Sequence, residues 1–119
     1  MFELSNRRFK MQKNKSGLVP VKINLNQKGI LTESFLTMLG AGVESILKRM
    51  FDLPGPEVSV TGTEPQLRSF ANALRDEKSY MESIIGNGLN NPTTFSSRYK
   101  LQNAVKNFET ETGLKWPIS

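Results

Sequence analysis

The fold of this chain is decided by residues 63–92, which read TEPQLRSFANALRDEKSYMESIIGNGLNNP. Thr63 followed by Gln66 is a capping-box pattern, in which each side chain satisfies the main-chain N–H of the other residue at the start of a helix. Apolar side chains then recur at the three- and four-residue spacing of one helix face: Leu67, Phe70, Ala71, Leu74, Met81, Ile84 and Ile85. The face between them carries the mixed charges of a solvated surface: Arg68, Arg75, Asp76, Glu77, Lys78 and Glu82. We therefore predict a long helix that is closed by residues 86–88, GNG.

A further helix is predicted to begin at Asn91-Pro92, with the asparagine as its cap and the proline at its first position. Its apolar stripe consists of Phe95, Tyr99, Leu101, Ala104, Val105 and Phe108. Gly113 is the expected cap at its end. We expect these last two helices to form a helical hairpin.

The only tryptophan, Trp116, follows this helix and lies in an apolar tail with Leu114 and Ile118. Two interpretations remain open. Trp116 either folds back to seal the helical pair or protrudes as an anchor for a partner, a role in which exposed tryptophan is favoured.

Toward the N-terminus, the pattern predicts short strands. Val21, Ile23 and Leu25 alternate with polar residues, which is typical of a strand with one buried face. Residues 57–61, EVSVT, are rich in β-branched side chains and predict a second strand. Two or three short strands do not make a self-sufficient sheet, so either a helix packs across them or a neighbouring chain completes the sheet.

A helix is predicted between these strands, from about Thr32 to the stop at residues 52–56, DLPGP. Residues 40–42, GAG, lie within its apolar pattern and favour close packing over contact with a ligand. We therefore expect an α+β fold with a basic extended arm over residues 1–17 and a single α+β domain over residues 18–119.

Positive charge is concentrated at the N-terminus. Residues 1–28 carry seven basic side chains and one acidic side chain, a net charge of +6, whereas residues 29–119 carry nine basic and ten acidic side chains. A basic arm on a near-neutral body indicates attachment to nucleic acid or to an acidic protein surface, unless it serves only as a solvated tail. The side chains that we expect to bind partners are Arg7, Arg8, Phe9, Lys10, Lys13 and Lys15, together with Trp116.

Cysteine and histidine are both absent from the chain. This absence excludes thiol nucleophiles, zinc sites built from these residues, and histidine general bases. Close carboxylates occur at Asp76-Glu77 and at Glu109 with Glu111, but neighbours one or two residues apart on a helix point in different directions. We therefore expect no enzyme, no catalytic residue, no metal and no cofactor. The longest apolar stretch, residues 35–51, is too short and too charged to span a bilayer.

The C-terminal half resembles small accessory proteins of tailed bacteriophages. The resemblance rests on residues 61–65, TGTEP, on residues 70–81, FANALRDEKSYM, and on residues 108–118, FETETGLKWPI. It implies a phage or phage-like context, and therefore a location in the virion or in the host cytoplasm.

These observations favour a non-enzymatic structural protein of a phage head, neck, tail or baseplate. Its basic arm would attach it to neighbouring subunits, either other proteins of the assembly or copies of itself. The first alternative is an accessory protein that uses the same arm to bind phosphates of a nucleic acid. The second alternative is a small modulator of a host enzyme, with the Trp116 tail as its anchor.

Overall fold

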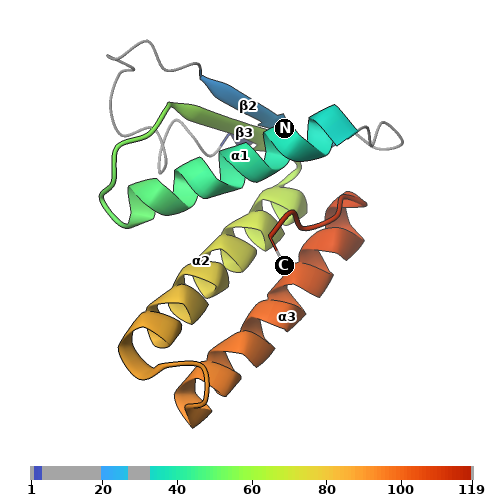
Figure 1. Ribbon diagram of the computed structural model, residues 1–119. Helices are drawn as coiled ribbons and strands as arrows, with labels where there is room; N and C mark the ends of the chain where they lie inside the picture. Colours follow the sequence, from blue (N-terminus) through green and yellow to red (C-terminus); the bar gives the residue numbers. More distant parts are fainter. Residues whose placement is uncertain (1, 4–19, 27–32, 119) are drawn as a thin grey trace.

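The chain forms an α+β fold in the computed structural model, which describes residues 2–3, 20–26 and 33–118 (Figure 1). In chain order its elements are β1 (Phe2–Glu3), β2 (Val21–Asn24), α1 (Glu33–Met50), β3 (Val58–Gly62), α2 (Glu64–Asn87) and α3 (Pro92–Thr112). The predicted class and the order of the helices are confirmed. Thr32, the predicted start of the first helix, lies outside the described residues.

A small sheet has the strand order β1-β3-β2. β2 and β3 are parallel, with Ile23 opposite Val60, and α1 supplies the crossover that a parallel pair requires. β1 pairs with the other edge of β3 in the antiparallel direction, with Phe2 opposite Gly62. β1 is the only described part of the predicted arm over residues 1–17, which stays a prediction for its other residues. Residues 4–19 lie outside the described residues.

Helix α1 lies across the sheet at very close range (Figure 1). Gly42 permits this approach, since a Cβ at this position would collide with the side chain of Ile23 and come within 3.2 Å of Val21. Ile23, Leu39, Val43 and Ile46 are all fully or almost fully buried where the helix meets the sheet. The prediction of close helix packing at residues 40–42 is thereby confirmed.

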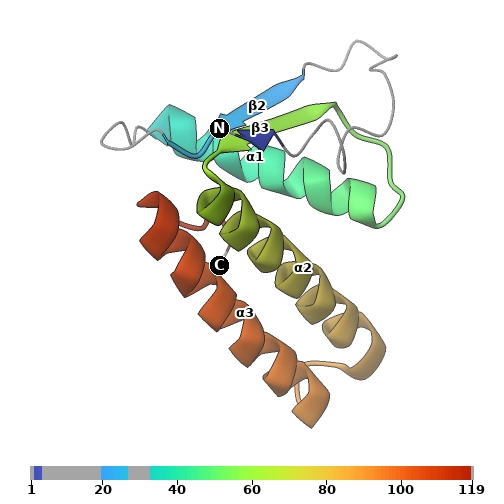
Figure 2. The same ribbon diagram turned by 180° about the vertical axis from the view of Figure 1, so that it is seen from behind.

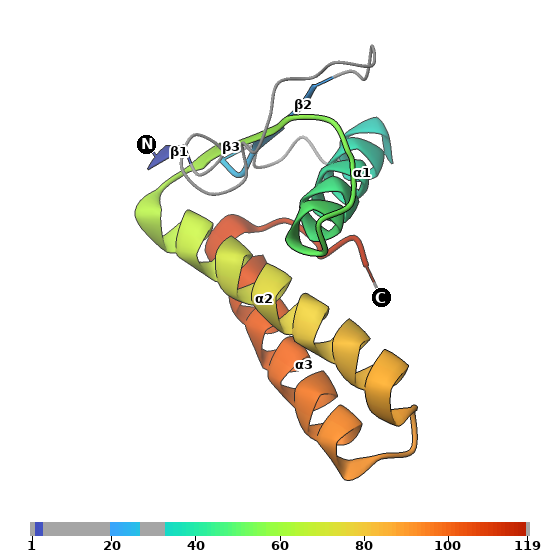
Figure 3. The same cartoon turned by 90° about the vertical axis from the view of Figure 1, so that its left-hand side faces the viewer.

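Helices α2 and α3 form the predicted hairpin, which projects away from the sheet and from α1 (Figures 1 and 3). Both halves of the capping box are present, because Thr63 N–H donates to Gln66 Oε1 at 2.9 Å and Gln66 N–H donates to Thr63 Oγ1 at 3.4 Å. Asn91 caps α3 through a bond from Thr93 N–H, and Gly113 ends α3 in the left-handed conformation at φ 74°. Each of these helix limits follows from a local sequence signal.

Burial along the hairpin differs from the predicted stripes. Near the sheet, Leu67, Phe70, Leu74 and Phe108 are buried as expected. Farther out, three predicted core residues are exposed, with exposed fractions of 81% for Ile85, 53% for Phe95 and 66% for Tyr99. The predicted stripes are wrong at these positions because the outer half of the hairpin extends beyond α1 and the sheet, as Figure 2 shows from behind.

Two glycine substitutions test the packing of α1 against the sheet. Gly42→Ala should lower the free energy of unfolding by about 1–3 kcal/mol, because the added methyl group overpacks the contact with Ile23. The matched control is Gly86→Ala, near the end of α2, where no atom lies within 4 Å of the added Cβ. This control should gain up to ~1 kcal/mol from helix propensity. Urea denaturation of both variants measures the difference, and equal effects of the two substitutions would contradict the described α1–sheet contact.

Candidate functional site

The residues predicted to bind partners fall into two groups. Arg7, Arg8, Phe9, Lys10, Lys13 and Lys15 lie outside the described residues. Trp116 is described and is only 6% exposed. The interpretation of Trp116 as a protruding anchor is therefore corrected, and its alternative, that the tryptophan folds back to seal the helical pair, is the observed arrangement. The physical reason is the aromatic and hydrogen-bonding site that the hairpin offers to the indole.

The Trp116 indole packs between α2 and α3. Its ring centroid lies 5.9 Å from that of Phe70 on α2 and 5.1 Å from that of Phe108 on α3, both in edge-to-face geometry. The indole N–H donates to Glu77 Oε1 at 3.0 Å, and the main-chain N–H of Trp116 donates to Glu109 Oε2 at 3.0 Å. We call this arrangement, with residues 113–118, the C-terminal clasp.

Glu77 is a buried carboxyl group, although the sequence pattern assigned it to the solvated face of its helix. It is 4% exposed. Burial raises its pKa above the usual 4.5, and the hydrogen bond from Trp116 partly opposes this effect. Trp116 is thus hydrogen-bonded to two carboxylates that lie at different distances along the chain. Glu77 precedes it by 39 positions and Glu109 by 7. The clasp gives both carboxylates a structural role.

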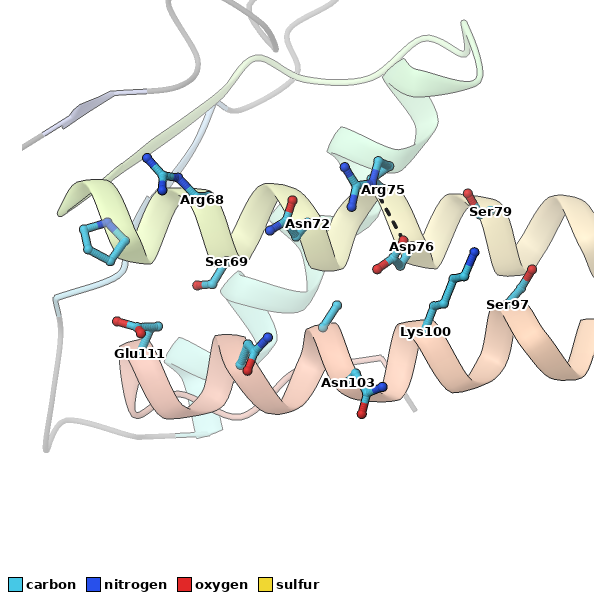
Figure 4. A pocket seen from close by; sticks show the side chains of 13 residues that line it. Arg68, Ser69, Asn72, Arg75, Asp76, Ser79, Ser97, Lys100, Asn103 and Glu111 are labelled. Atoms are coloured by element: carbon cyan, nitrogen blue, oxygen red, sulfur yellow. Dashed lines mark ion pairs between the residues drawn. The ribbon is translucent and has the colours of Figure 1, made fainter.

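A polar groove runs between α2 and α3 and has a volume of about 1020 Å³ (Figure 4). Ser69 and Ala104 are buried residues in its lining. Asn72 and Ser79 line it from α2, whereas Asn103 and Asn107 line it from α3. No aromatic side chain is among the lining residues. The groove therefore offers amide and hydroxyl groups but no surface for stacking.

Three cations and two acids complete the groove: Arg68, Arg75, Lys100, Asp76 and Glu111. Arg68 pairs with Glu64 at 3.2 Å, and Arg75 pairs with Asp76 at 3.7 Å. The Lys100 side chain extends from α3 toward α2 near Asp76 and Ser79 in Figure 4, and it makes no hydrogen bond or ion pair within the described part of the chain. The lining thus carries a small positive excess.

Large apolar side chains gather at the outer half of the hairpin and beside it. Phe51, Leu53, Met81, Ile84 and Ile85 line an open recess of about 560 Å³. The Lys78 ammonium group lies 5.1 Å from the centroid of the Phe51 ring. Leu89 is 60% exposed in the connection between α2 and α3. We call the four exposed side chains Ile85, Leu89, Phe95 and Tyr99 the apolar end of the hairpin.

No group of three or more carboxylates that could hold a metal ion occurs within residues 2–3, 20–26 and 33–118. Lys100 lines the groove, whereas its neighbour Tyr99 belongs to the apolar end. No described helix has the length and apolar character needed to cross a membrane.

No protein-family model matches this chain, and no curated protein or solved structure matches it. The chemistry of its surfaces is therefore the basis for assigning a function.

Sequence reasoning missed both surfaces of the hairpin. The groove residues Asn72, Asn103 and Asn107 had no distinguishing spacing, because they come from two helices that approach each other only in the folded chain. The sequence did indicate that some apolar side chains of the hairpin would be exposed. The two predicted helices are long, and the predicted strands are too short for the sheet to cover both helices along their whole length. The sequence alone did not show at which residues of the hairpin the contact with α1 and the sheet ends.

The charge of Glu77 should make stability depend on pH. Folding raises the pKa of Glu77, so the folded chain binds the carboxyl proton more strongly than the unfolded chain does. The free energy of unfolding therefore falls as pH rises from the pKa of Glu77 in the unfolded chain through its pKa in the folded chain. Glu77→Gln keeps an oxygen that accepts the indole N–H and removes this loss. The free energy of unfolding of the variant, relative to the natural chain, should therefore increase between pH 4.5 and pH 7. Urea denaturation at a series of pH values measures this difference, and a relative stability that falls as pH rises would contradict the buried position of the carboxyl group.

Proposed function

We propose that this chain is a non-enzymatic interaction protein that works as a subunit of a larger protein assembly. The observation that carries the proposal is the apolar end of the hairpin, where four large side chains are each more than half exposed. Phe95 and Tyr99 stand one turn apart on α3, whereas Ile85 lines the recess beside Phe51 and Leu53. Exposed apolar side chains that are close neighbours on a protein surface, as Phe95 and Tyr99 are, are typical of protein–protein contact sites. The partner that fits this end is another protein subunit with an apolar surface of its own.

The composition of the apolar end supports a protein partner. Phe95 and Tyr99 are one helical turn apart on α3, so their side chains lie on the same side of that helix. Aromatic side chains are enriched at the centres of protein interfaces. Their rings bury a large apolar area and lose little conformational entropy on binding, because each has only two rotatable side-chain bonds.

The placement of the apolar end also favours docking. The hairpin carries these side chains away from the sheet and α1, so that a partner can approach from several directions (Figure 3). The clasp fixes the inner half of the hairpin, at Phe70 and Phe108. A projection that is held firmly at its base presents its contact residues with little entropy left to lose on binding.

The nature of the assembly is proposed from the sequence. The resemblance of the C-terminal half to accessory proteins of tailed bacteriophages supports a virion as the assembly. The net charge of +6 over residues 1–28 supports a second attachment, to an acidic protein surface. If this segment instead bound nucleic acid, affinity would fall steeply with salt concentration.

Site-specific photo-crosslinking tests the proposal. A photoreactive phenylalanine derivative is placed at position 95 or 99, and the protein is expressed in the cells that naturally produce it. After irradiation, it should form covalent adducts with another protein. The control position is Lys106, which is exposed on the same side of α3 but about 16 Å closer to the sheet than Phe95. It should give few adducts.

Two outcomes would overturn the proposal. The apolar end would not be the contact site if positions 95 and 106 formed adducts equally or if no adducts formed at 95 and 99. Adducts with nucleic acid alone would favour the nucleic-acid-binding alternative.

A further inference from the structure

The polar groove has unused hydrogen-bonding capacity. Within the described residues, no hydrogen bond or ion pair engages the side chains of Asn72, Asn103, Asn107 or Lys100. Each asparagine offers an oxygen that accepts and a nitrogen that donates, so it can bind both a C=O and an N–H of the same ligand. These amides stand on both walls of the groove, one on α2 and two on α3.

An extended polypeptide has the groups that such amides bind. Its main chain presents N–H and C=O groups at regular intervals, whereas a helix has already used most of its own. The groove follows α2 from Pro65 to Ser79, a rise of about 21 Å along the helix axis. At about 3.3 Å per residue, it accommodates about six residues of an extended chain.

The charges of the groove select among such peptides. Three cations face two acids in the lining, and one of the acids, Asp76, is already paired with Arg75. Lys100 reaches across the groove without a partner, and the Arg68–Glu64 pair is exposed, so it can exchange partners at little cost. A carboxylate on the ligand therefore gains a charge-assisted hydrogen bond from Lys100.

We infer that the groove between α2 and α3 binds an extended, acidic peptide segment of a partner protein. Asn72, Asn103 and Asn107 hold its main chain, and Lys100 and Arg68 bind its carboxylates. This site is separate from the apolar end, because no residue of that end lines the groove.

Other occupants fit less well. A single-stranded nucleic acid gains much of its affinity from stacking on aromatic rings, and the groove lining contains none. An amphipathic helix requires apolar pockets at helical spacing, whereas polar and charged side chains dominate this lining.

Fluorescence anisotropy tests the inference directly. The probe is a fluorescein-labelled peptide of about eight residues in which glutamate alternates with serine. A peptide with lysine in place of glutamate and a thymidine oligonucleotide serve as comparison ligands. The acidic peptide should bind the full chain saturably at low ionic strength, and the lysine peptide should not.

Substitutions on α3 decide whether the groove is the site. The basic residues 1–28 also attract an acidic peptide, so saturable binding alone is not sufficient. Lys100→Glu should weaken binding about tenfold, the result of losing one good contact. Lys106→Glu makes the same charge change on α3 outside the groove and should alter the dissociation constant less than about twofold. Asn103→Ala with Asn107→Ala should weaken binding about fivefold without changing the net charge.

Three results would overturn the inference: no saturable binding of the acidic peptide, equal losses in the Lys100 and Lys106 variants, or tighter binding of the oligonucleotide with sensitivity to Lys100→Glu. The last result would assign the groove to nucleic acid. Circular dichroism of each variant confirms that its helices are intact, which is expected because these side chains make no hydrogen bond or ion pair within the described chain.

Discussion

The insertion of Trp116 between Phe70 and Phe108 is the interaction on which the arrangement of this molecule depends. The indole fills the space between α2 and α3 close to the sheet, and both of its N–H groups, from the ring and from the main chain, are satisfied by carboxylates on those helices. The next residue, Pro117, lies within 3.4 Å of the position of a Cβ on Gly40 of α1. The clasp thereby joins the hairpin to the layer formed by α1 and the sheet. Emptying a buried tryptophan site costs about 3–5 kcal/mol, a large part of the total stability of a small domain.

The clasp also divides the hairpin into two parts with different roles. Near the clasp, the apolar side chains of α2 and α3 are buried against the tail, α1 and the sheet, and they hold the fold together. Beyond the clasp, the same helices are covered less completely, and Ile85, Phe95 and Tyr99 are mostly exposed. The two helices hold each other there through polar contacts, such as the 3.0 Å bond between Ser83 and Ser97. A partner can therefore bind the outer half without disturbing the core.

Local signals in the sequence predicted the elements well, because each signal acts over a few residues. The Thr63–Gln66 capping box, the Asn91-Pro92 start of α3 and the Gly113 end of α3 are all present in the structure. Burial was predicted less well, because it depends on what lies opposite a residue. Tyr99 has the spacing of a core residue, yet it is 66% exposed. Glu77 has the spacing of a surface residue, yet it is buried and accepts a hydrogen bond from Trp116. The groove combines residues from two helices, and no pattern within either helix indicates it.

The most direct test of this account follows the only tryptophan in the chain while the helices unfold. Urea denaturation is recorded simultaneously by indole fluorescence and by helical circular dichroism. If the clasp joins the hairpin to the rest of the fold, the native chain emits as a buried indole, and both signals change in one transition with a shared midpoint. Native emission typical of a water-exposed indole, or an indole transition that is complete before the helices unfold, would show that the clasp does not hold the structure together.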